Sequence, residues 1–302
     1  MNGSSVHLFE VAPPIIGGPP SYGNSSLPVS LLAESRSRLV TTSDYTALDR
    51  PEISANSFYP RPGWTATPQG AEDHTIDVGD VIALSCRFFP VGVPNPTILF
   101  FYGNGETAVD YDNIAPLYQG IGANFLVADY RGYGRSGGSP SFSTMLTDAH
   151  QVLDFTLKLL KGKLLADRQH TGPVFVMGRS MGRHAAFELA VSRAQDINGV
   201  IIESGRPTLG QFANGLEEPV AQKMEEDYRA KVASINIPVL VIHGEIDTLA
   251  PLPEAVGMFQ SIESTEKRMI TVPGAGHNDL LYQGRAQYFA AVQDFVDRNS
   301  GQ

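Results

Sequence analysis

The chain has 302 residues, 42% of them hydrophobic, with a formal net charge of −10 and a pI near 5.1. This length accommodates one large α/β domain with a substantial core. The acidic balance argues against nucleic-acid partners and anionic membrane surfaces, which attract basic faces, and the single cysteine, Cys86, excludes intrachain disulfides and multi-thiolate metal sites. One cysteine also agrees with a reducing compartment, so we expect a cytoplasmic protein.

Residues 1–50 are rich in Gly, Pro and Ser, as in "PPIIGGPPSYGNSS", and show no sustained hydrophobic period. We interpret them as an N-terminal arm that is either mobile or folded over the functional site as a lid. The start lacks the basic and apolar regions of a signal peptide, and no apolar run in the sequence is long enough to span a bilayer. Residues 51–302 are predicted to form a single domain.

Short apolar runs dominate the chain from about residue 71. The stretch "HTIDVGDVIALSCRFF" predicts a hairpin. Six further runs predict strands at 97–102, 124–129, 173–178, 199–204, 238–243 and 268–272. Because these runs do not alternate with polar residues, we expect strands covered on both faces, as in a parallel sheet. With helical periodicity in the spacers, the sequence predicts an α/β fold of about eight strands, with ligands bound beyond their carboxyl ends.

The pattern G-x-S-x-G, found around the nucleophilic serine of many hydrolases, occurs twice: "GRSGG" at 134–138 and "GRSMG" at 178–182. Ser180 follows a predicted strand and precedes a predicted helix, the context in which a tight turn exposes a nucleophile. Ser136 lies several residues beyond its strand, among glycines and before Pro140. We therefore predict Ser180 as the nucleophile and interpret Ser136 as an ordinary loop serine.

A serine hydroxyl needs a base to take its proton and a carboxylate to orient that base. Asp247 follows the strand in "PVLVIHGEIDTLAP", and His277 follows the strand in "RMITVPGAGHNDL". The order Ser, acid, His is that of α/β-hydrolases. The sequence thus predicts a triad of Ser180, Asp247 and His277.

Three other residues compete for these roles or flank them. Glu203, at the end of the run 199–204, is the alternative acid. His184 lies one helical turn beyond Ser180, where a packing or surface role is expected instead of a base. His243 is expected to support the loop of Asp247.

Developing negative charge on the substrate carbonyl requires preorganised N–H donors. We expect one donor to be the backbone N–H of Met181, the residue after the nucleophile, and the other that of Asn104 in "FYGNGE". Tyr102, Gly103 and Gly105 of the same loop are predicted to border the substrate.

Taken in order, the motifs "YGNGE", "DYRGYGRSGG", "GRSMG", "HGEID" and "GAGHND" resemble those of α/β-hydrolases. The chain is similar to the group that includes monoacylglycerol-lipase-like enzymes and protein depalmitoylases, over about residues 70–300. The resemblance implies hydrolysis of an ester, thioester or amide through an acyl-enzyme, on a small-molecule or acylated substrate, without cofactor or metal. It also implies a mostly parallel sheet with helices on both faces.

The sequence departs from this group at two places. Tyr102 stands where the group usually has His, and Arg183 and His184 stand where a small residue is more usual. Two interpretations of Arg183 and His184 remain open. They are unusual polar partners near Ser180, or they lie on an exposed helix surface. The connection from Arg206 to Ile237 has room for one or two helices, which predicts a minimal cap.

Three other interpretations remain open at this point. A serine peptidase or amidase would use the same triad. A nicotinamide-dependent oxidoreductase is suggested by "GNGETA" from Gly103 with Asp129 as the ribose-binding acid. A non-catalytic ligand-binding protein could share the fold. Metal catalysis has little support, because the seven histidines are dispersed without a ligand motif.

Overall fold

The computed structural model describes residues 44–163 and 171–301. Residues 1–43 of the predicted arm lie outside the described residues, so its role as a mobile segment or lid stays a prediction. The end of the arm is described: Tyr45 and Leu48 are buried, and the Tyr45 ring meets that of Phe142 edge-on with centroids 5.1 Å apart. These two side chains pack with the domain predicted for residues 51–302.

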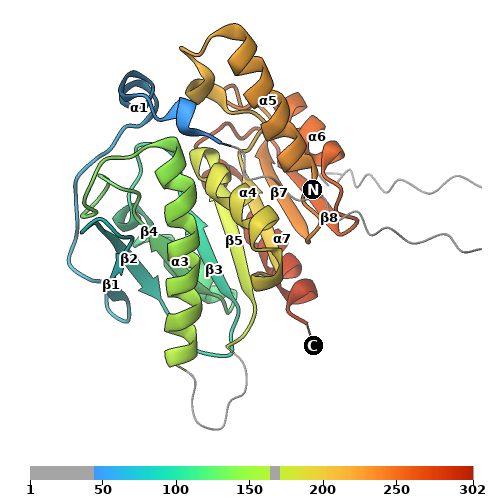
Figure 1. Ribbon diagram of the computed structural model, residues 1–302. Coiled ribbons are helices and arrows are strands. Elements are labelled where there is room, and N and C mark those ends of the chain that lie inside the picture. Colours follow the sequence, from blue (N-terminus) through green and yellow to red (C-terminus); the bar gives the residue numbers. More distant parts are fainter. Residues whose placement is uncertain (1–43, 164–170, 302) are drawn as a thin grey trace, which may run out of the picture. The chain divides into compact units, whose positions relative to one another are not determined.

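An eight-stranded sheet in the order β1-β2-β4-β3-β5-β6-β7-β8 forms the centre of this domain (Figure 1). The hairpin of β1 and β2 is antiparallel, β2 pairs antiparallel with β4, and the other neighbours are parallel. The predicted hairpin and the predicted mostly parallel sheet are confirmed. The strands are β1 (Glu72–Asp77), β2 (Ala83–Phe89), β3 (Thr97–Phe101), β4 (Asn124–Ala128), β5 (Val174–Arg179), β6 (Gly199–Glu203), β7 (Val239–Gly244) and β8 (Lys267–Val272).

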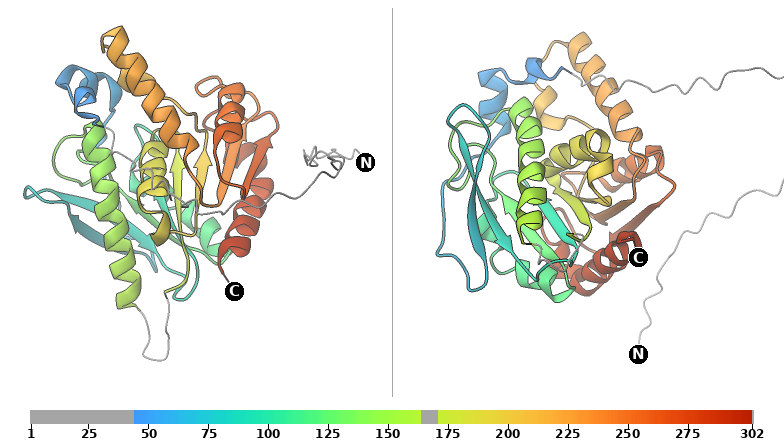
Figure 2. Two further views of the ribbon diagram at one scale, coloured as in Figure 1. Left: turned by 45° about the vertical axis from the view of Figure 1, so that its right-hand side comes forward. Right: turned by 60° about the horizontal axis from the view of Figure 1, so that its bottom comes forward.

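Helices cover both faces of the sheet. The α-helices are α1 (Pro51–Ser57), α2 (Ala115–Gly120), α3 (Phe142–Gly162), α4 (Arg183–Ser192), α5 (Glu218–Ala233), α6 (Leu252–Ser261) and α7 (Leu280–Asn299). Short 3-10 helices are η1 (Thr46–Leu48), η2 (Ala108–Tyr111), η3 (Ser180–Gly182), η4 (Ala194–Asp196) and η5 (Gly210–Ala213). Helices α3 and α4 lie on one face, and α2 and α7 lie on the other (Figure 2).

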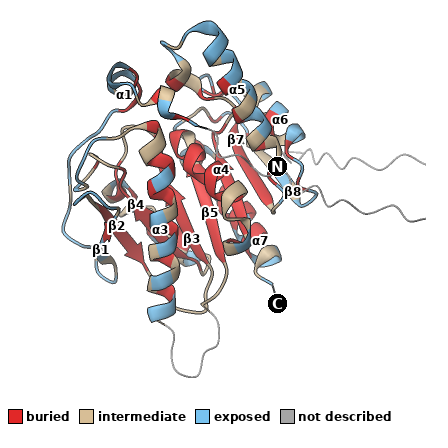
Figure 3. Cartoon of the chain, in the orientation of Figure 1, coloured by how far each residue is buried: buried red, intermediate tan, exposed pale blue. Residues whose placement is uncertain are grey.

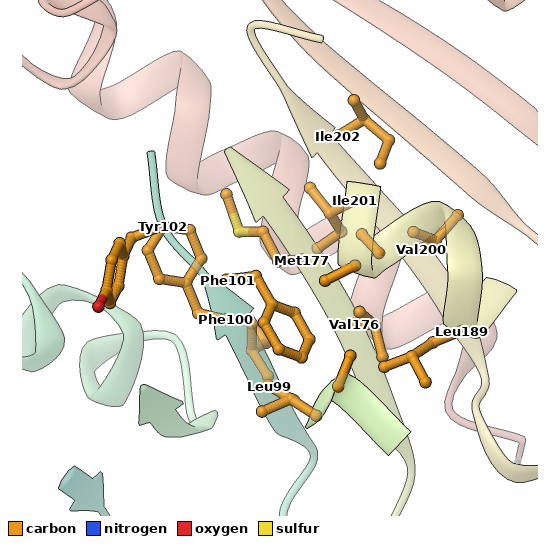
Figure 4. Close-up of a cluster of buried hydrophobic side chains, with 14 of the residues drawn as sticks. Leu99, Phe100, Phe101, Tyr102, Val176, Met177, Leu189, Val200, Ile201 and Ile202 are labelled. Carbon is orange, nitrogen blue, oxygen red and sulfur yellow. The ribbon is translucent and has the colours of Figure 1, made fainter. Parts of the chain in front are cut away.

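Burial follows from this layering. Every residue of β3, β4, β6 and β7 is buried, whereas the edge strand β1 exposes alternate residues. The inner strands are buried throughout while the outer sides of α3 and α5 are exposed (Figure 3). Leu99, Val176 and Val200 of adjacent strands lie with Leu189 of α4 in one apolar layer (Figure 4). A rigid core of this kind fixes the loops at the strand ends.

The cap is small. The connection from Arg206 to Ile237 contains only η5 and α5, which agrees with the predicted minimal cap. The segment after α1 packs on η5: the Phe58 and Phe212 rings have centroids 5.0 Å apart, and Gln211 Nε2 donates to the Ser57 carbonyl at 3.0 Å. The cover beside the carboxyl ends of the strands therefore combines η5 with residues near α1.

Candidate active site

Ser180 sits on a tight turn between β5 and α4, the strand–turn–helix context that the sequence predicted. Its φ is +50°, in the left-handed region, where a non-glycine residue is strained. The neighbouring glycines make the turn possible. A Cβ on Gly178 would lie 2.7 Å from the Ala186 Cβ, and one on Gly182 would lie 2.0 Å from the Phe101 carbonyl oxygen.

The loops after β7 and β8 bring the other two predicted residues to Ser180. His277 Nε2 lies 2.8 Å from Ser180 Oγ, and His277 Nδ1 lies 2.8 Å from Asp247 Oδ2. A carboxylate can only accept, so Nδ1 carries the imidazole proton and Nε2 is left to accept the hydroxyl proton. The three side chains form one hydrogen-bonded chain from residues up to 97 positions apart.

The Asp247 carboxylate is fixed from several sides. Its Oδ1 accepts from the backbone N–H groups of Leu249 at 2.9 Å and Ala250 at 2.8 Å. Burial by itself would raise the pKa of Asp247, but the hydrogen bonds from His277 and Ala250 outweigh it and hold this pKa below its usual value. His243 is within 2.7 Å of the Ala250 carbonyl oxygen, so it supports the Asp247 loop as expected.

Glu203, the alternative acid, is engaged elsewhere. Its Oε1 accepts from Arg179 Nε at 3.0 Å, and its Oε2 accepts from the Tyr288 hydroxyl at 2.6 Å. Burial raises its pKa above the usual value, with Arg179 acting in the opposite direction. The acid hydrogen-bonded to the His277 ring is Asp247.

The sequence reasoning missed Arg179, which precedes Ser180. Arg179 forms an ion pair with Glu106, and its Nη2 donates to Asn278 Oδ1 at 2.7 Å and to the His277 carbonyl at 3.3 Å. Arg179, the residue before Ser180, thus holds the loop that carries the His277 imidazole. The only sequence feature that singled out Arg179 was its place in "GRSMG", and this motif does not indicate where the arginine side chain points.

A cavity of about 370 Å³ opens beside Ser180; we call it the Ser180 cavity. It is lined by residues that include Tyr59, Asn104, Met181, Arg183, Arg206 and His277. Its volume lies near the lower end of the range for ligand sites, about 300–1,000 Å³. Asn104 and Met181, the predicted oxyanion donors, both border it. The Asn104 side chain points to other partners, donating to the Ser57 carbonyl at 2.7 Å and accepting from the Tyr133 hydroxyl at 2.7 Å.

The predicted substrate contact of Tyr102 needs correction. Tyr102 is fully buried, and its hydroxyl donates to Asp129 Oδ1 at 2.9 Å. In the described part of the chain it does not line the Ser180 cavity, nor do Gly103 and Gly105. Gly103 N–H donates to Glu106 Oε2 at 2.8 Å, and Gly105 has φ +79°, so both glycines shape the loop that presents Asn104.

Ser136 is bound in a structural role away from the imidazole. Its hydroxyl oxygen accepts from Ser85 N–H at 2.9 Å, and the hydroxyl donates to the Asp129 carbonyl at 3.2 Å. Asp129 was the candidate ribose-binding acid under the hypothesis of a nicotinamide-dependent oxidoreductase. It is buried and accepts hydrogen bonds from the Tyr102 and Ser85 hydroxyls and from the Ala108 N–H. These contacts fix it within the core, which removes it from reach of a ribose.

Arg183 and His184 are buried, so the exposed-surface interpretation of this pair is wrong. Arg183 donates to the carbonyls of Ser180 at 2.8 Å, Thr208 at 2.8 Å and Arg206 at 3.0 Å. His184 Nδ1 lies 2.5 Å from the Tyr228 hydroxyl, and burial lowers its pKa well below the usual value. His184 therefore packs as a neutral ring.

No helix within residues 44–163 and 171–301 has both the length and the apolar composition needed to cross a bilayer. Residues 92–215 match the family described as serine aminopeptidase, S33.

Two curated proteins and one solved structure illustrate the similarity. The chain is 27% identical over 215 residues to protein bem46 of Schizosaccharomyces pombe, covering 68% of each. It is 28% identical over 221 residues to alpha/beta hydrolase domain-containing protein 17B of Xenopus tropicalis, covering 70% of each. Its structure is similar to esterase Pf2001 of Pyrococcus furiosus, with a TM-score of 0.63 and 20% identity over 81% of this chain and 100% of that one. At that identity the likeness shows a shared fold.

Proposed function

We propose that this chain, which belongs to the α/β-hydrolase superfamily, is a serine hydrolase that cleaves a carboxylic ester or acyl thioester through an acyl-enzyme. The observation that carries the proposal is the hydrogen-bonded chain of Ser180, His277 and Asp247, with two distances of 2.8 Å. The fold likeness to an esterase agrees with it.

The first half of the reaction forms the acyl-enzyme. His277 Nε2 takes the Ser180 hydroxyl proton while Oγ bonds to the carbonyl carbon, and the carbonyl electron pair moves onto oxygen. The N–H groups of Met181 and Asn104 stabilise that oxyanion, each worth about 2.7–4 kcal/mol in enzymes of this type. The tetrahedral intermediate then collapses, and His277 gives its proton to the leaving alcohol or thiol.

The second half repeats these steps with water as the nucleophile. His277 takes a proton from water, the hydroxide oxygen bonds to the acyl carbon, and Ser180 Oγ leaves with the proton returned from Nε2. Asp247 stays ionised throughout, because hydrogen bonds hold its pKa below the usual value. It fixes the ring orientation and balances the imidazolium charge.

A fluorophosphonate probe tests the proposal. We expect Ser180→Ala to lose labelling and to lower p-nitrophenyl ester turnover by about 10⁴-fold or more. The matched control is Ser136→Ala, the other serine of a G-x-S-x-G pattern, which should keep both. Full turnover in folded Ser180→Ala would overturn the proposal.

Amide hydrolysis is the second candidate, favoured by the match to a family described as serine aminopeptidase. The same triad cleaves amides when the imidazolium reaches the leaving nitrogen. Matched esters, thioesters and anilides with one acyl group would rank the substrate classes by kcat/KM. We expect the esters and thioesters to exceed the anilide.

A further inference from the structure

The charged wall of the Ser180 cavity is dominated by arginines. Arg179, Arg183 and Arg206 line the cavity, and Glu106 is the only carboxylate among the described residues that line it. Glu106 is paired with Arg179. Arg179 also bonds Glu203, so its charge is compensated. The remaining positive charge at the cavity comes from Arg183 and Arg206.

Arg183 and Arg206 are neighbours. The Nη2 atoms of Arg206 and Arg183 lie 3.1 Å and 3.7 Å from the point where a side chain at Gly210 would begin. Gly210 has φ +64°, a conformation that favours glycine, so residue 210 places no side chain beside the two guanidinium groups. Two like charges placed together in a partly buried cavity repel each other unless an anion lies between or beside them.

The hydrogen bonds of Arg183 leave its charge without a directly bonded carboxylate. All three acceptors of Arg183 among the described residues are backbone carbonyls. Burial lowers the pKa of Arg183 to about 10, and the nearby Arg206 acts in the same direction. A bound anion would act in the opposite direction and raise the pKa of Arg183.

Arg206 is the freer of the two. Its one ion-pair partner in the described chain is Glu254, with Nη1 and Oε2 separated by 3.7 Å and the Glu254 side chain 40% exposed. Glu225, the other nearby acid, accepts from the Leu209 N–H. Neither Glu225 nor Glu254 lines the Ser180 cavity. The carboxylates near these two arginines therefore lie outside the lining of the cavity, whereas both arginines are part of it.

This cationic wall adjoins the nucleophile. Arg183 Nη1 bonds the Ser180 carbonyl at 2.8 Å, so its guanidinium lies one hydrogen bond from the residue that attacks the substrate. His184 also lines the cavity, and its Nε2 has no partner among the described residues. The His184 ring is held by its Nδ1, which hydrogen-bonds with the Tyr228 hydroxyl. Arg183 and Arg206 therefore carry the charge of this part of the cavity lining, and His184 packs beside them.

We propose that Arg206, with Arg183 behind it, forms a carboxylate-binding subsite, so that the preferred substrate is a short ester or thioester bearing a carboxylate near the scissile carbonyl. This inference rests on the proposed function for its catalytic consequence. The planar guanidinium fork matches a carboxylate in geometry and charge. The small volume of the cavity favours a short chain.

Matched pairs of esters test the subsite. Ethyl hydrogen succinate carries a carboxylate on the acyl side, and ethyl 4-methylpentanoate replaces that carboxylate by an isosteric isopropyl group. The pair 3-acetoxypropanoate and 3-methylbutyl acetate does the same on the leaving-group side. Each hydrolysis consumes water and releases an alcohol, a carboxylate and one proton, which a pH-stat counts.

We expect the parent to favour one anionic ester over its isostere by about tenfold or more in kcat/KM, as one charge-assisted hydrogen bond would give. Whichever pair shows the preference tells which side of the scissile bond occupies the subsite. Arg206→Gln should remove most of the preference, and Arg206→Lys should keep part of it. Arg298→Gln is the charge-matched control, since Arg298 is 74% exposed and lies at the end of α7; it should keep the preference. No preference in either pair, or an equal loss in both Gln variants, would overturn the subsite.

A binding measurement separates this inference from the proposed function. Calorimetry with succinate on Ser180→Ala reports the subsite without any turnover. Binding that disappears in the double variant Ser180→Ala with Arg206→Gln supports the subsite even if the hydrolase proposal fails. Absence of succinate binding alongside Ser180-dependent hydrolysis of neutral esters would overturn the subsite and leave the hydrolase proposal standing.

Discussion

Arg179 Nη2 donates to Asn278 Oδ1 at 2.7 Å. This bond joins the residue before Ser180 to the residue after His277, although they are 99 positions apart in the chain. It constrains the separation of Ser180 and His277 from outside the triad. Proton transfer depends steeply on that separation.

Loss of this bond should reduce the rate of the chemical step. We predict that Asn278→Ala lowers kcat by about tenfold with little change in KM, because the imidazole loop gains freedom while the arginine wall stays in place. Asn278→Asp retains an acceptor for Arg179 and should recover most of the loss. Steady-state kinetics on a neutral ester give the comparison. A rise in KM alone would point to substrate contact instead of positioning.

Arg179 itself should matter for stability as well. Its side chain is 11% exposed and is paired with Glu106 and with Glu203, which is 6% exposed. Arg179→Met leaves the buried Glu203 and the partly buried Glu106 without their cation, which we expect to lower the free energy of unfolding by about 3–5 kcal/mol. Urea denaturation measures this loss. Arg298→Met, at an exposed ion pair, should leave the midpoint close to that of the parent.

Glu188 should contribute a pH-dependent part of the stability. Burial works to raise its pKa, but His150, Lys231 and Ser192 outweigh burial and lower the pKa to about 2. Since the folded pKa lies below the unfolded value, the contribution is complete above about pH 4.5 and is lost as pH falls toward 2. Glu188→Gln should therefore cost about 3 kcal/mol at pH 7 and progressively less below pH 4.5. A deficit equally large at pH 7 and pH 3 in urea denaturation would contradict this.

Tyr102 provides a test of the corrected oxyanion loop. Its hydroxyl donates to Asp129 and accepts from Tyr130 N–H at 3.2 Å. Tyr102→Phe leaves these buried partners less satisfied, so we expect a loss of about 1–3 kcal/mol in unfolding free energy. KM for neutral esters should stay close to that of the parent, because the ring lies outside the Ser180 cavity. A several-fold change in KM without destabilisation would restore the original expectation.

Much of the fold could be predicted because its signals are local. The runs that became β3, β4, β6 and β7 lack polar alternation, and strands covered on both faces require that pattern. The turn at Ser180 is also a local feature. It requires glycine at positions 178 and 182 for steric reasons, and a segment with helical periodicity follows it directly. The order Ser180, Asp247, His277 was readable for the same reason, since each residue follows its own strand.

The cavity wall could not be predicted in this way. From the sequence, Arg183 could be either a polar partner near Ser180 or part of an exposed helix surface. Tyr102 was predicted to border the substrate. In the structure the Arg183 side chain is buried and donates to the carbonyls of Arg206 and Thr208. The Tyr102 hydroxyl donates to Asp129 and does not line the cavity. The Asp129 carboxylate and the carbonyls of Arg206 and Thr208 are at least 23 positions distant in the chain from the side chains that they bind.

Hydrophobic period and turn chemistry act between near neighbours, so they sufficed to predict the strands, the helical spacers, the tight turn at Ser180 and the loops that carry Asp247 and His277. The competition between Asp247 and Glu203 was resolved by folding, which bonds Asp247 to His277 and Glu203 to Arg179. Folding also placed Arg183 and Arg206 in the lining of one cavity. The physical reason is that a buried polar side chain turns to whichever partner satisfies its charge and hydrogen bonds, and that partner is supplied by folding.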